Sequence, residues 1–468
     1  MTTDAEIIAL VRSAGVVGAG GAGFPTHVKL AARVDTVIAN GAECEPVLTC
    51  DQALMAHRAE DVLAGVRLAM AATGATNGVI ALKAAYKDAV TALQRALARS
   101  TSAPAVRLHF LAPVYPAGDE FILAYEVTGR LVPEAGIPLN VGIVVQNVGT
   151  LANIAAAVRG QPVTHRWLTV AGEVNEPKTV CVPIGTSIAE VIGLAGGLRG
   201  PGGRTLPVRE ASLSAQGDLA VITGGPMMGK IAWDVQQPIT KTTSGILVLK
   251  RNTAVVRNLT TPAGNWVRRG RSACDQCRDC TELCPRYLLG HSLQPHEVMR
   301  SINYGLTDRP DIVTRAVLCC ECRLCEAFAC PLELSPMAYY RSIKQELAAQ
   351  GWRNTRHRRT DLTPIDMRPY RLVPTHRLVQ HLGLEEYEQR GAPLDPRACV
   401  PPQVTVPLRL PLPSAVAATP VVSVGDRVRV GQPIAEIPEG KLSARVHASI
   451  DGTVQAVKPG EHVIITRD

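Results

Sequence analysis

Cys274-Asp-Gln-Cys-Arg-Asp-Cys-Thr-Glu-Leu-Cys284-Pro285 is the stretch of sequence that organises this chain. Its cysteines follow the spacing C-x2-C-x2-C-x3-C-P, which lets the thiolates of one turn-rich loop reach three corners of an iron–sulfur cube. A second run of cysteines ends at Cys330-Pro331, and it contains Cys319, Cys320, Cys322, Cys325 and Cys330. Nine of the thirteen cysteines lie in these two runs. The sequence therefore predicts an iron–sulfur protein that transfers electrons.

The two runs predict two [4Fe–4S] clusters that share ligands. In two-cluster ferredoxins the fourth cysteine of each run binds the other cluster. We therefore assign one cluster to Cys274, Cys277, Cys280 and Cys330. The second cluster is assigned to Cys319, Cys322, Cys325 and Cys284. Cys319 keeps the x2 spacing, but the tandem Cys319-Cys320 leaves open which of the two is the ligand. A zinc site or a disulfide knot is the alternative, which two Cys-Pro runs in a chain of reduced thiols disfavour.

Composition limits the class of protein. A length of 468 residues allows about three ordinary domains, and an aromatic content of 4% favours α/β layers filled by aliphatic side chains. The charged opening residues predict no secretory signal, and no run of eighteen apolar residues suggests a membrane span. We therefore expect a cytoplasmic protein without a transmembrane segment. The net charge of +8 is modest, and a nucleic-acid partner is not expected because the arginine-rich stretch 353–359 lacks interleaved aromatic residues.

The first 160 residues alternate between strand-like and helical patterns. Residues 34–40 and 78–82 predict short buried strands, with a helix over 61–72 between them. A glycine-rich loop precedes the first strand and contains Gly18, Gly20, Gly21 and Gly23. These glycines free the backbone to approach a ligand and to point N–H groups at a phosphate. The loop is not a Rossmann fingerprint, because it comes before a strand instead of after one.

Three further blocks follow the glycine loop in order. They are Asn40-Gly-Ala-Glu-Cys-Glu-Pro46, Tyr115-Pro-Ala-Gly-Asp-Glu120 and Gln146-Asn-Val-Gly-Thr-Leu-Ala-Asn153. The four blocks together resemble the flavin-binding NADH dehydrogenase subunit of respiratory complex I and the C subunit of the Rnf complex. In domain order the chain is most similar to the cobalamin reductases of propanediol-utilisation microcompartments.

This resemblance implies an FMN and NADH site. FMN would lie on the glycine loop, with Lys29 near its phosphate, and Phe24 would help to hold NADH. The other implied cofactor contacts are Asn40, Glu43, Glu45, Gly118, Asn147 and Thr150. Tyr115 and Glu120 would face the isoalloxazine and the nicotinamide as the catalytic residues. The chain departs from the family pattern at Ala19, where complex I has arginine, and at Gln146 and Gly149.

The resemblance also predicts a multidomain α/β architecture. A Rossmann-like FMN and NADH domain would span 1–160, and a soluble-ligand-binding β-grasp module would span 163–245. A two-cluster ferredoxin-like helical segment would follow over 262–350, then a linker over 351–400 and a lipoyl-like barrel-sandwich hybrid over 401–468. Cobalamin is the family's candidate ligand for the β-grasp module, although the D-x-H-x-x-G signature of base-off cobalamin folds is absent.

The implied function is the transfer of electrons from NADH through FMN and two [4Fe–4S] clusters to a corrinoid or corrinoid enzyme in a bacterial microcompartment. A shell protein or an iron–sulfur protein is a further candidate partner. A non-catalytic electron conduit and an Rnf-type subunit are the alternatives. The amphipathic opening segment, with Ile7, Ile8 and Val11 on one helical face, predicts either core packing or a docking surface for such a partner.

Overall fold

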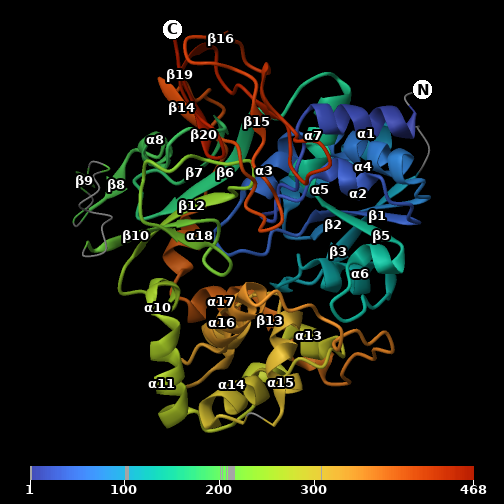
Figure 1. The fold of residues 1–468 in the computed structure, drawn as a ribbon, viewed down its shortest axis with the longest axis vertical. Coiled ribbons are helices and arrows are strands. Elements are labelled where there is room, and N and C mark those ends of the chain that lie inside the picture. Colours follow the sequence, from blue (N-terminus) through green and yellow to red (C-terminus); the bar gives the residue numbers. More distant parts are fainter. Residues whose placement is uncertain are drawn as a thin grey trace.

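The computed structural model describes residues 3–100, 105–200, 202, 204–206, 208, 217–306 and 308–468. Figure 1 shows two tiers: three bodies with β-sheets lie above, and the helices of the cysteine-rich segment lie below. No helix among these described residues is both long enough and apolar enough to cross a membrane.

The first body is a parallel α/β sheet. Its strand order is β3-β2-β1-β5, with every neighbouring pair parallel. The strands are β1 (Thr36–Gly41), β2 (Asn77–Lys83), β3 (Val106–Leu111) and β5 (Ile143–Asn147). The helices include α1 (Asp4–Ser13), α2 (Thr26–Leu30), α3 (Cys50–His57), α4 (Ala59–Thr73), α5 (Lys87–Arg99), α6 (Glu120–Thr128) and α7 (Val148–Val158). The two strands and the helix expected within 34–82 are therefore present, with ends shifted by a few residues.

Helices α4 and α7 cross at very short range because of a glycine. A Cβ added to Gly65 of α4 would lie 2.0 Å from the carbonyl oxygen of Leu151 on α7. No larger residue fits there without separating the helices. The close crossing fixes α7, whose N-terminus follows β5 directly, against the rest of the sheet.

Helix α1 belongs to the core of this body. Thr3 begins the helix with a capping box that includes Glu6. Ile7 and Val11 are 1% and 0% exposed and lie in the main apolar cluster, while Ile8 is half-buried at its edge. The apolar face of the opening segment is thus used for core packing, and the docking alternative is dropped.

The second body is a mixed five-stranded sheet in the order β11-β10-β12-β6-β7. Strand β12 pairs with β6 in parallel and the other pairs are antiparallel. Ser187 begins α8 with a capping box. The elements are β6 (His165–Gly172), β7 (Lys178–Pro183), α8 (Ile188–Leu194), β8 (Leu198–Arg199), β9 (Thr205–Leu206), β10 (Leu219–Thr223), β11 (Lys230–Ala232) and β12 (Gly245–Lys250).

The lower tier contains the cysteine-rich segment. Its helices lie together at the lower end of the molecule (Figure 1). They are α10 (Ala254–Thr260), α11 (Ala263–Ala273), α12 (Asp279–Glu282), α13 (Pro285–Leu288), α14 (Pro295–Tyr304), α15 (Pro310–Thr314) and α16 (Pro336–Ala349). Helix α16 follows the second cysteine run and packs on it.

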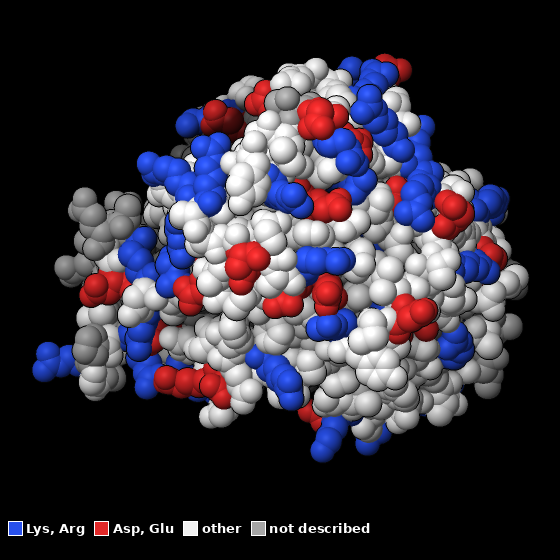
Figure 2. Space-filling view, turned by 90° about the horizontal axis from the view of Figure 1, so that it is seen from below, with Lys and Arg blue, Asp and Glu red and all other residues white. Residues whose placement is uncertain are grey.

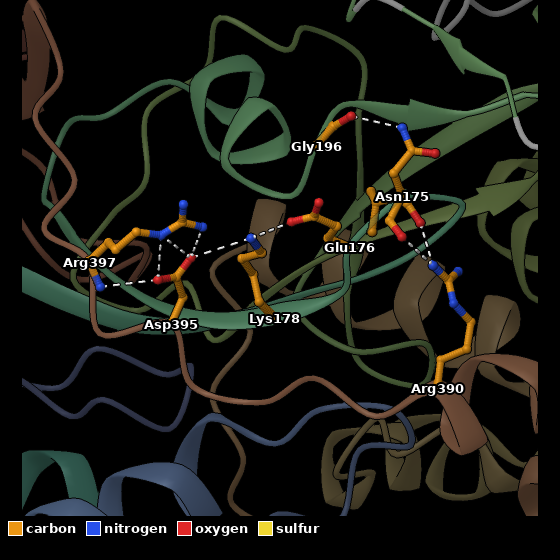
Figure 3. A network of polar contacts seen from close by, with 8 residues as sticks. Asn175, Glu176, Lys178, Gly196, Arg390, Asp395 and Arg397 are labelled. Carbon is orange, nitrogen blue, oxygen red and sulfur yellow. Dashed lines mark hydrogen bonds and ion pairs between the residues drawn. The ribbon is translucent and has the colours of Figure 1, made fainter.

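The stretch 351–400 is more than a linker. It contains β13 (Val373–Pro374), α17 (Thr375–His381) and α18 (Glu385–Arg390). Strand β13 pairs with β4 (Val114–Tyr115) of the first body. The end of the stretch 351–400 is bound to the five-stranded sheet of the second body, which is called here the β-grasp-like sheet. Figure 3 shows that the buried Lys178 of this sheet contacts Glu176 and Asp395. Arg390 donates to the carbonyl oxygens of Val174 and Asn175. The polar and aromatic residues of this stretch therefore brace the two tiers.

The last body has two small sheets, in the orders β14-β20-β19-β16 and β15-β17-β18. It lies beside the first two bodies in the upper tier (Figure 1). Its strands are β14 (Gln403–Pro407), β15 (Thr419–Pro420), β16 (Arg427–Val428), β17 (Pro433–Glu436), β18 (Val446–His447), β19 (Gly452–Lys458) and β20 (His462–Thr466). All sheet pairs in it are antiparallel.

The burial of α1 generates a stability prediction. Ile7→Ala should lower the free energy of unfolding by about 2 to 5 kcal/mol, because it leaves a cavity in a closed core. Ile8→Ala removes the same atoms from a half-buried position and should lower the free energy of unfolding by clearly less. Denaturant unfolding of the two variants measures the difference. Equal losses would contradict the packing described for α1.

Candidate functional site

The parallel sheet has a switch point between β1 and β5, and the space beyond the carboxyl ends of these two strands is called here the crevice. The chain places β2 and β3 on one side of β1 and β5 on the other, so the strand order reverses at β1. Ligands of open α/β sheets bind at such a switch point, beyond the carboxyl ends of the strands. Asn40 near the end of β1 is paired in register with Asn147 at the end of β5. Two asparagines predicted from separate blocks thus lie side by side on neighbouring strands at this edge of the sheet.

The glycine loop lies over this crevice. A Cβ added to Gly20 would lie 3.4 Å from the Asn147 Cβ, whereas one added to Gly21, whose φ is +110°, would meet nothing within 4 Å. Gly20 and Gly21 are exposed. Within the part of the chain that the structure describes, no group accepts a hydrogen bond from the N–H of Gly20, Gly21, Ala22 or Gly23. The loop therefore offers a row of free donors of the kind that binds phosphate.

Buried contacts hold the loop in place. The N–H of Ala19 donates to the Thr150 hydroxyl at 2.8 Å, and the Arg166 guanidinium donates to the Ala19 carbonyl at 2.7 Å. The N–H of Gly18 donates to the carbonyl of Phe24 at 2.9 Å and closes the loop at its other end. Thr150 thus fixes the loop backbone, and Arg166, which the sequence did not single out, contributes from the β-grasp-like sheet.

The third block closes the crevice on the other side. The amide of Asn40 donates to the Gly118 carbonyl at 2.9 Å. Lys29 donates to Glu120 at 2.9 Å and to the Val145 carbonyl at 3.1 Å. Lys29 and Glu120 are 24% and 43% exposed, so this ion pair borders solvent. The positive charge of Lys29 is therefore already balanced by Glu120.

A group of acids lies beneath the crevice. The side chains of Glu43, Cys50 and Asp51 approach within 4.8 Å of one another, and Asp51 accepts a hydrogen bond from the Asn147 amide at 2.7 Å. The pKa of Glu43 is raised well above its usual value, first by burial and then by the charges of Asp51 and Glu45. Burial also raises the pKa of Asp51. Both carboxyl groups therefore favour the protonated form more than a free acid does.

Asp51 and Cys50 were missed in the sequence. They belong to the first turn of α3, just beyond the block that ends at Pro46. A carboxyl group so soon after a predicted ligand block was the available signal, but nothing in the spacing showed that its side chain would reach Asn147.

Glu45 faces the β-grasp-like sheet. Its two carboxylate oxygens accept hydrogen bonds from the N–H groups of Met227 and Met228, both at 2.8 Å. Burial raises the pKa of Glu45 to about 7, although these two bonds oppose the shift. Glu45 therefore joins two bodies, and its contact with a cofactor stays a prediction.

Tyr115 is buried at the boundary between the tiers. It is 2% exposed, and its hydroxyl donates to the carbonyl of Cys322 at 2.9 Å. This contact gives Tyr115 a positioning role between the first body and the second cysteine run. A catalytic role for Tyr115 stays a prediction, and the open crevice borders Glu120 instead.

The first predicted set of cluster cysteines lies together. Cys274, Cys277, Cys280 and Cys330 line one pocket. The pKa of Cys280 is raised by burial and then by Cys330, Cys277 and Cys274. Cys330 accepts a hydrogen bond from the Leu334 N–H at 3.4 Å, and Cys274 accepts one from the Gln276 amide at 3.3 Å. Cys330 thus crosses over from the second run to join three cysteines of the first.

The second set is more deeply buried. Cys284, Cys322 and Cys325 are 8%, 8% and 9% exposed. The pKa of Cys325 is raised well above its usual value by burial and then by Cys319, among other groups. The pKa of Cys319 is raised by burial, and the thiols of Cys320 and Cys284 add to this. Cys284 of the first run is therefore among the cysteines of the second.

The two cysteine loops have matching backbones. Gln276 and Arg278, which flank Cys277, have φ values of +65° and +72°. Glu321 and Arg323, which flank Cys322, have φ values of +60° and +62°. The two loops therefore turn alike around their middle cysteines.

The spacing of the thiols disfavours zinc. Four thiolates about 2.3 Å from one zinc ion would be only about 4 Å apart. Among the described residues, no three cysteine sulfurs lie within 4.8 Å of one another. Two sets of more widely spaced thiols fit polynuclear clusters.

Four family models match successive parts of the chain. They are the Nuo51 FMN-binding domain over 11–156, the SLBB domain over 168–230, the 4Fe-4S dicluster domain over 273–335 and the RnfC barrel sandwich hybrid domain over 395–467. The free N–H donors of the glycine loop and the paired asparagines fit a flavin phosphate and its polar chain. The chain is thus an oxidoreductase that uses FMN and iron–sulfur clusters.

The relatives agree with these matches. The chain is 45% identical to the cobalamin reductase PduS of Salmonella typhimurium, over 97% of this chain and 94% of that protein. It is 39% identical to one component of the Na⁺-translocating ferredoxin:NAD⁺ oxidoreductase complex of Acetobacterium woodii, over 61% of this chain and 59% of that one. The solved structure of an NAD⁺-reducing [NiFe]-hydrogenase is similar over 81% of this chain and over 67% of the hydrogenase chain, with 24% identity and a TM-score of 0.46. The extent and identity of the first match show that the chain belongs to the PduS cobalamin reductase family.

Proposed function

We propose that this protein passes electrons from NADH through FMN and two [4Fe–4S] clusters to a corrinoid. The observation that carries the proposal is the hydrogen bond from Tyr115 to the Cys322 carbonyl. It joins the body that holds the flavin crevice to the backbone of a predicted cluster ligand. Through this contact the proposed donor body and the proposed cluster segment would be held in a fixed position relative to each other.

The residues of the crevice would share the binding of FMN. The loop N–H groups of Gly20, Gly21 and Gly23 would hold the phosphate, with Gly18 and Thr150 fixing the loop. Asn40, Gly118 and Asn147 would contact the polar chain and the ring edge. FMN accepts a hydride as an electron pair and releases the electrons singly, which matches paired one-electron clusters.

Other residues of the crevice would serve NADH. Phe24 is half-buried beside the loop, and Glu120 borders solvent next to Lys29. Glu120 would orient the nicotinamide, while Lys29 would hold Glu120 in place. Glu43, with its raised pKa, would keep a proton near the flavin.

Cys319 is the better candidate for the fourth ligand of the second cluster. The matched left-handed residues make Cys322 equivalent to Cys277, and counting back three residues then makes Cys319 equivalent to Cys274. Cys319 also accepts a hydrogen bond from the Glu321 N–H at 3.3 Å, as Cys274 does from the Gln276 side chain. Cys320 lies instead beside Cys322 and Arg286, whose contacts lower the pKa of Cys320 to about 7.

The corrinoid acceptor is proposed from the cobalamin reductase PduS. We extend to this protein the microcompartment localisation that the resemblance in sequence implies. A shell protein or another iron–sulfur protein would then be a neighbour. The SLBB match covers the module that binds Glu45 through Met227 and Met228, so the module would brace the flavin site as well as offer a ligand surface.

NADH should bleach both chromophores of the anaerobically purified protein, and a cob(III)alamin added afterwards should restore them. The flavin should be reduced before the clusters, because it is the flavin that reduces them. Stopped-flow absorbance measures each step. Clusters present without flavin, or a flavin that NADH leaves oxidised, would contradict the proposal and favour the conduit alternative.

Reconstituted protein should contain about eight iron and eight sulfide per chain. Cys277→Ala should remove one cluster and leave most of the other. Cys320→Ala should retain both, because Cys319 supplies the ligand, whereas Cys319→Ala should lose one. Iron analysis and electron paramagnetic resonance distinguish these outcomes. Saturation at four iron would rule out the two-cluster assignment.

Gly21→Val should weaken FMN binding tenfold or more, about 1.4 kcal/mol. The added side chain would project into the open space above the crevice. Gly129→Val is the matched control, since Gly129 also has a positive φ, +72°, with nothing within 4 Å of an added Cβ. Flavin fluorescence after release measures FMN per chain. Equal FMN content in the two variants would show that the site lies elsewhere, and the cluster spectra should survive both changes.

A further inference from the structure

The two predicted clusters occupy different positions relative to the flavin body. The second set of cysteines, Cys284, Cys319, Cys322 and Cys325, is called here the inner set. It touches the flavin body twice: through Tyr115 at the Cys322 carbonyl, and through Arg286, which follows Cys284-Pro285 and binds Asp119 at 2.6 and 2.9 Å. Asp119 caps α6, which begins with Glu120. The inner set is therefore fixed to the same elements that build the crevice.

The other set, Cys274, Cys277, Cys280 and Cys330, is called here the outer set. Cys277 is exposed and Cys274 and Cys330 are half-buried. The pocket that these four cysteines line also includes Leu332, a leucine 38% exposed to solvent. Helices α11 and α14 flank the outer set at the lower end of the molecule (Figure 1). A cluster there would lie closer to the surface than one held by the inner set, in which Cys284, Cys322 and Cys325 are buried.

Five arginines that form no ion pair with the described residues lie on the elements next to the outer set, and they are called here the arginine rim. They are Arg268, Arg269 and Arg271 on α11, Arg278 beside Cys277, and Arg300 on α14, and all five are exposed. None of the five forms an ion pair with any residue that the structure describes. Glu297 and Glu333, the nearby glutamates, are bound to Arg315 and Arg257. Asp275 and Asp279 remain as local acids, so the rim keeps a positive excess.

The rim also has an apolar part. Tyr304 is 61% exposed and lies four residues after Arg300 on α14, so both point from one face of that helix. Figure 2, seen from below, shows charges of both signs over this end of the molecule, with white surface between them. An arginine rim with an exposed tyrosine and leucine has the composition of a protein-binding surface. It is unlike the closed surroundings of the inner set.

We propose that electrons enter the cysteine-rich segment at the inner cluster and leave from the outer one, and that the arginine rim docks an acidic electron-carrier protein. This inference rests on the proposed function for its electron source. One NADH would yield NAD⁺, one proton and two electrons. The electrons would leave the outer cluster one at a time, so two carriers would each be reduced by one electron. The complementary charges would speed encounter and orient the carrier's redox centre toward Cys277.

Charge reversal tests the docking surface. The variant Arg268→Glu, Arg271→Glu, Arg300→Glu changes three rim arginines, none of them a cluster ligand. The matched control is Arg95→Glu, Arg409→Glu, Arg429→Glu, which makes the same change in net charge at exposed positions of the upper tier. The probe is a small acidic [2Fe–2S] ferredoxin, mixed with protein reduced beforehand by dithionite that is then removed.

At low ionic strength the rim variant should reduce the ferredoxin at least tenfold more slowly than the control, and the wild-type rate should fall as salt is added. Equal rates in the two variants would overturn the docking surface. The midpoint potential of each cluster is measured in parallel. A rate loss explained by a shifted potential would show that the arginines tune the cluster, and would also overturn the proposal.

Loss of the outer cluster tests the order of transfer. In Cys277→Ala, NADH should still reduce the inner cluster, seen by electron paramagnetic resonance, while ferredoxin reduction is lost. An inner cluster that NADH no longer reduces, or a ferredoxin rate equal to wild type, would overturn the order. If NADH fails to reduce the wild-type protein at all, the proposed function fails instead, and the dithionite experiment still judges the docking surface.

Discussion

The buried ion pair between Asp119 and Arg286 is the contact on which the arrangement of the molecule depends. Their side chains are 15% and 8% exposed, and the guanidinium also lies 3.8 Å above the ring of Phe121. A two-pronged pair of this kind fixes direction as well as distance. Loss of one partner from a buried pair costs about 3 to 5 kcal/mol, because the other charge is left without compensation. Asp119 also caps α6, so one carboxylate sets both the helix beside the crevice and the position of the inner cysteines.

A second set of contacts keeps the flavin body from moving against the β-grasp-like sheet. Arg166 reaches from β6 to the Ala19 carbonyl, and Glu45 reaches the opposite way to the N–H groups of Met227 and Met228. Each contact is made by a charged group to backbone atoms, which hold a fixed position. The loop that offers its N–H groups to phosphate is therefore held by both bodies: by Thr150 of its own body and by Arg166 of the β-grasp-like sheet.

The acids beneath the crevice have raised pKa values. Glu43 and Asp51 cannot both ionise at low cost, because both are buried and close to each other. Asn147 binds Asp51 and also accepts from the Gly149 N–H at 2.8 Å, so the same amide orients the acid and caps α7. A hydride acceptor bound above this group would lie near two carboxyl groups whose pKa values are raised.

The sequence alone determined the chemistry of the clusters, because ligand spacing within one loop is a local property: three cysteines at intervals of three residues must lie on one turn. It also determined the order of the bodies and the α/β pattern of the first. The tertiary structure determined the contacts between residues that lie far apart in the chain. It placed Asn40 beside Asn147, brought Asp51 under them, buried Tyr115 against Cys322 and ordered 351–400 into helices. These pairings join residues up to some two hundred positions apart in the chain, and no local spacing encodes them. The choice between Cys319 and Cys320 needed both the sequence and the structure. The spacing of the cysteines left the choice open, and the left-handed backbone around Cys322 favours Cys319.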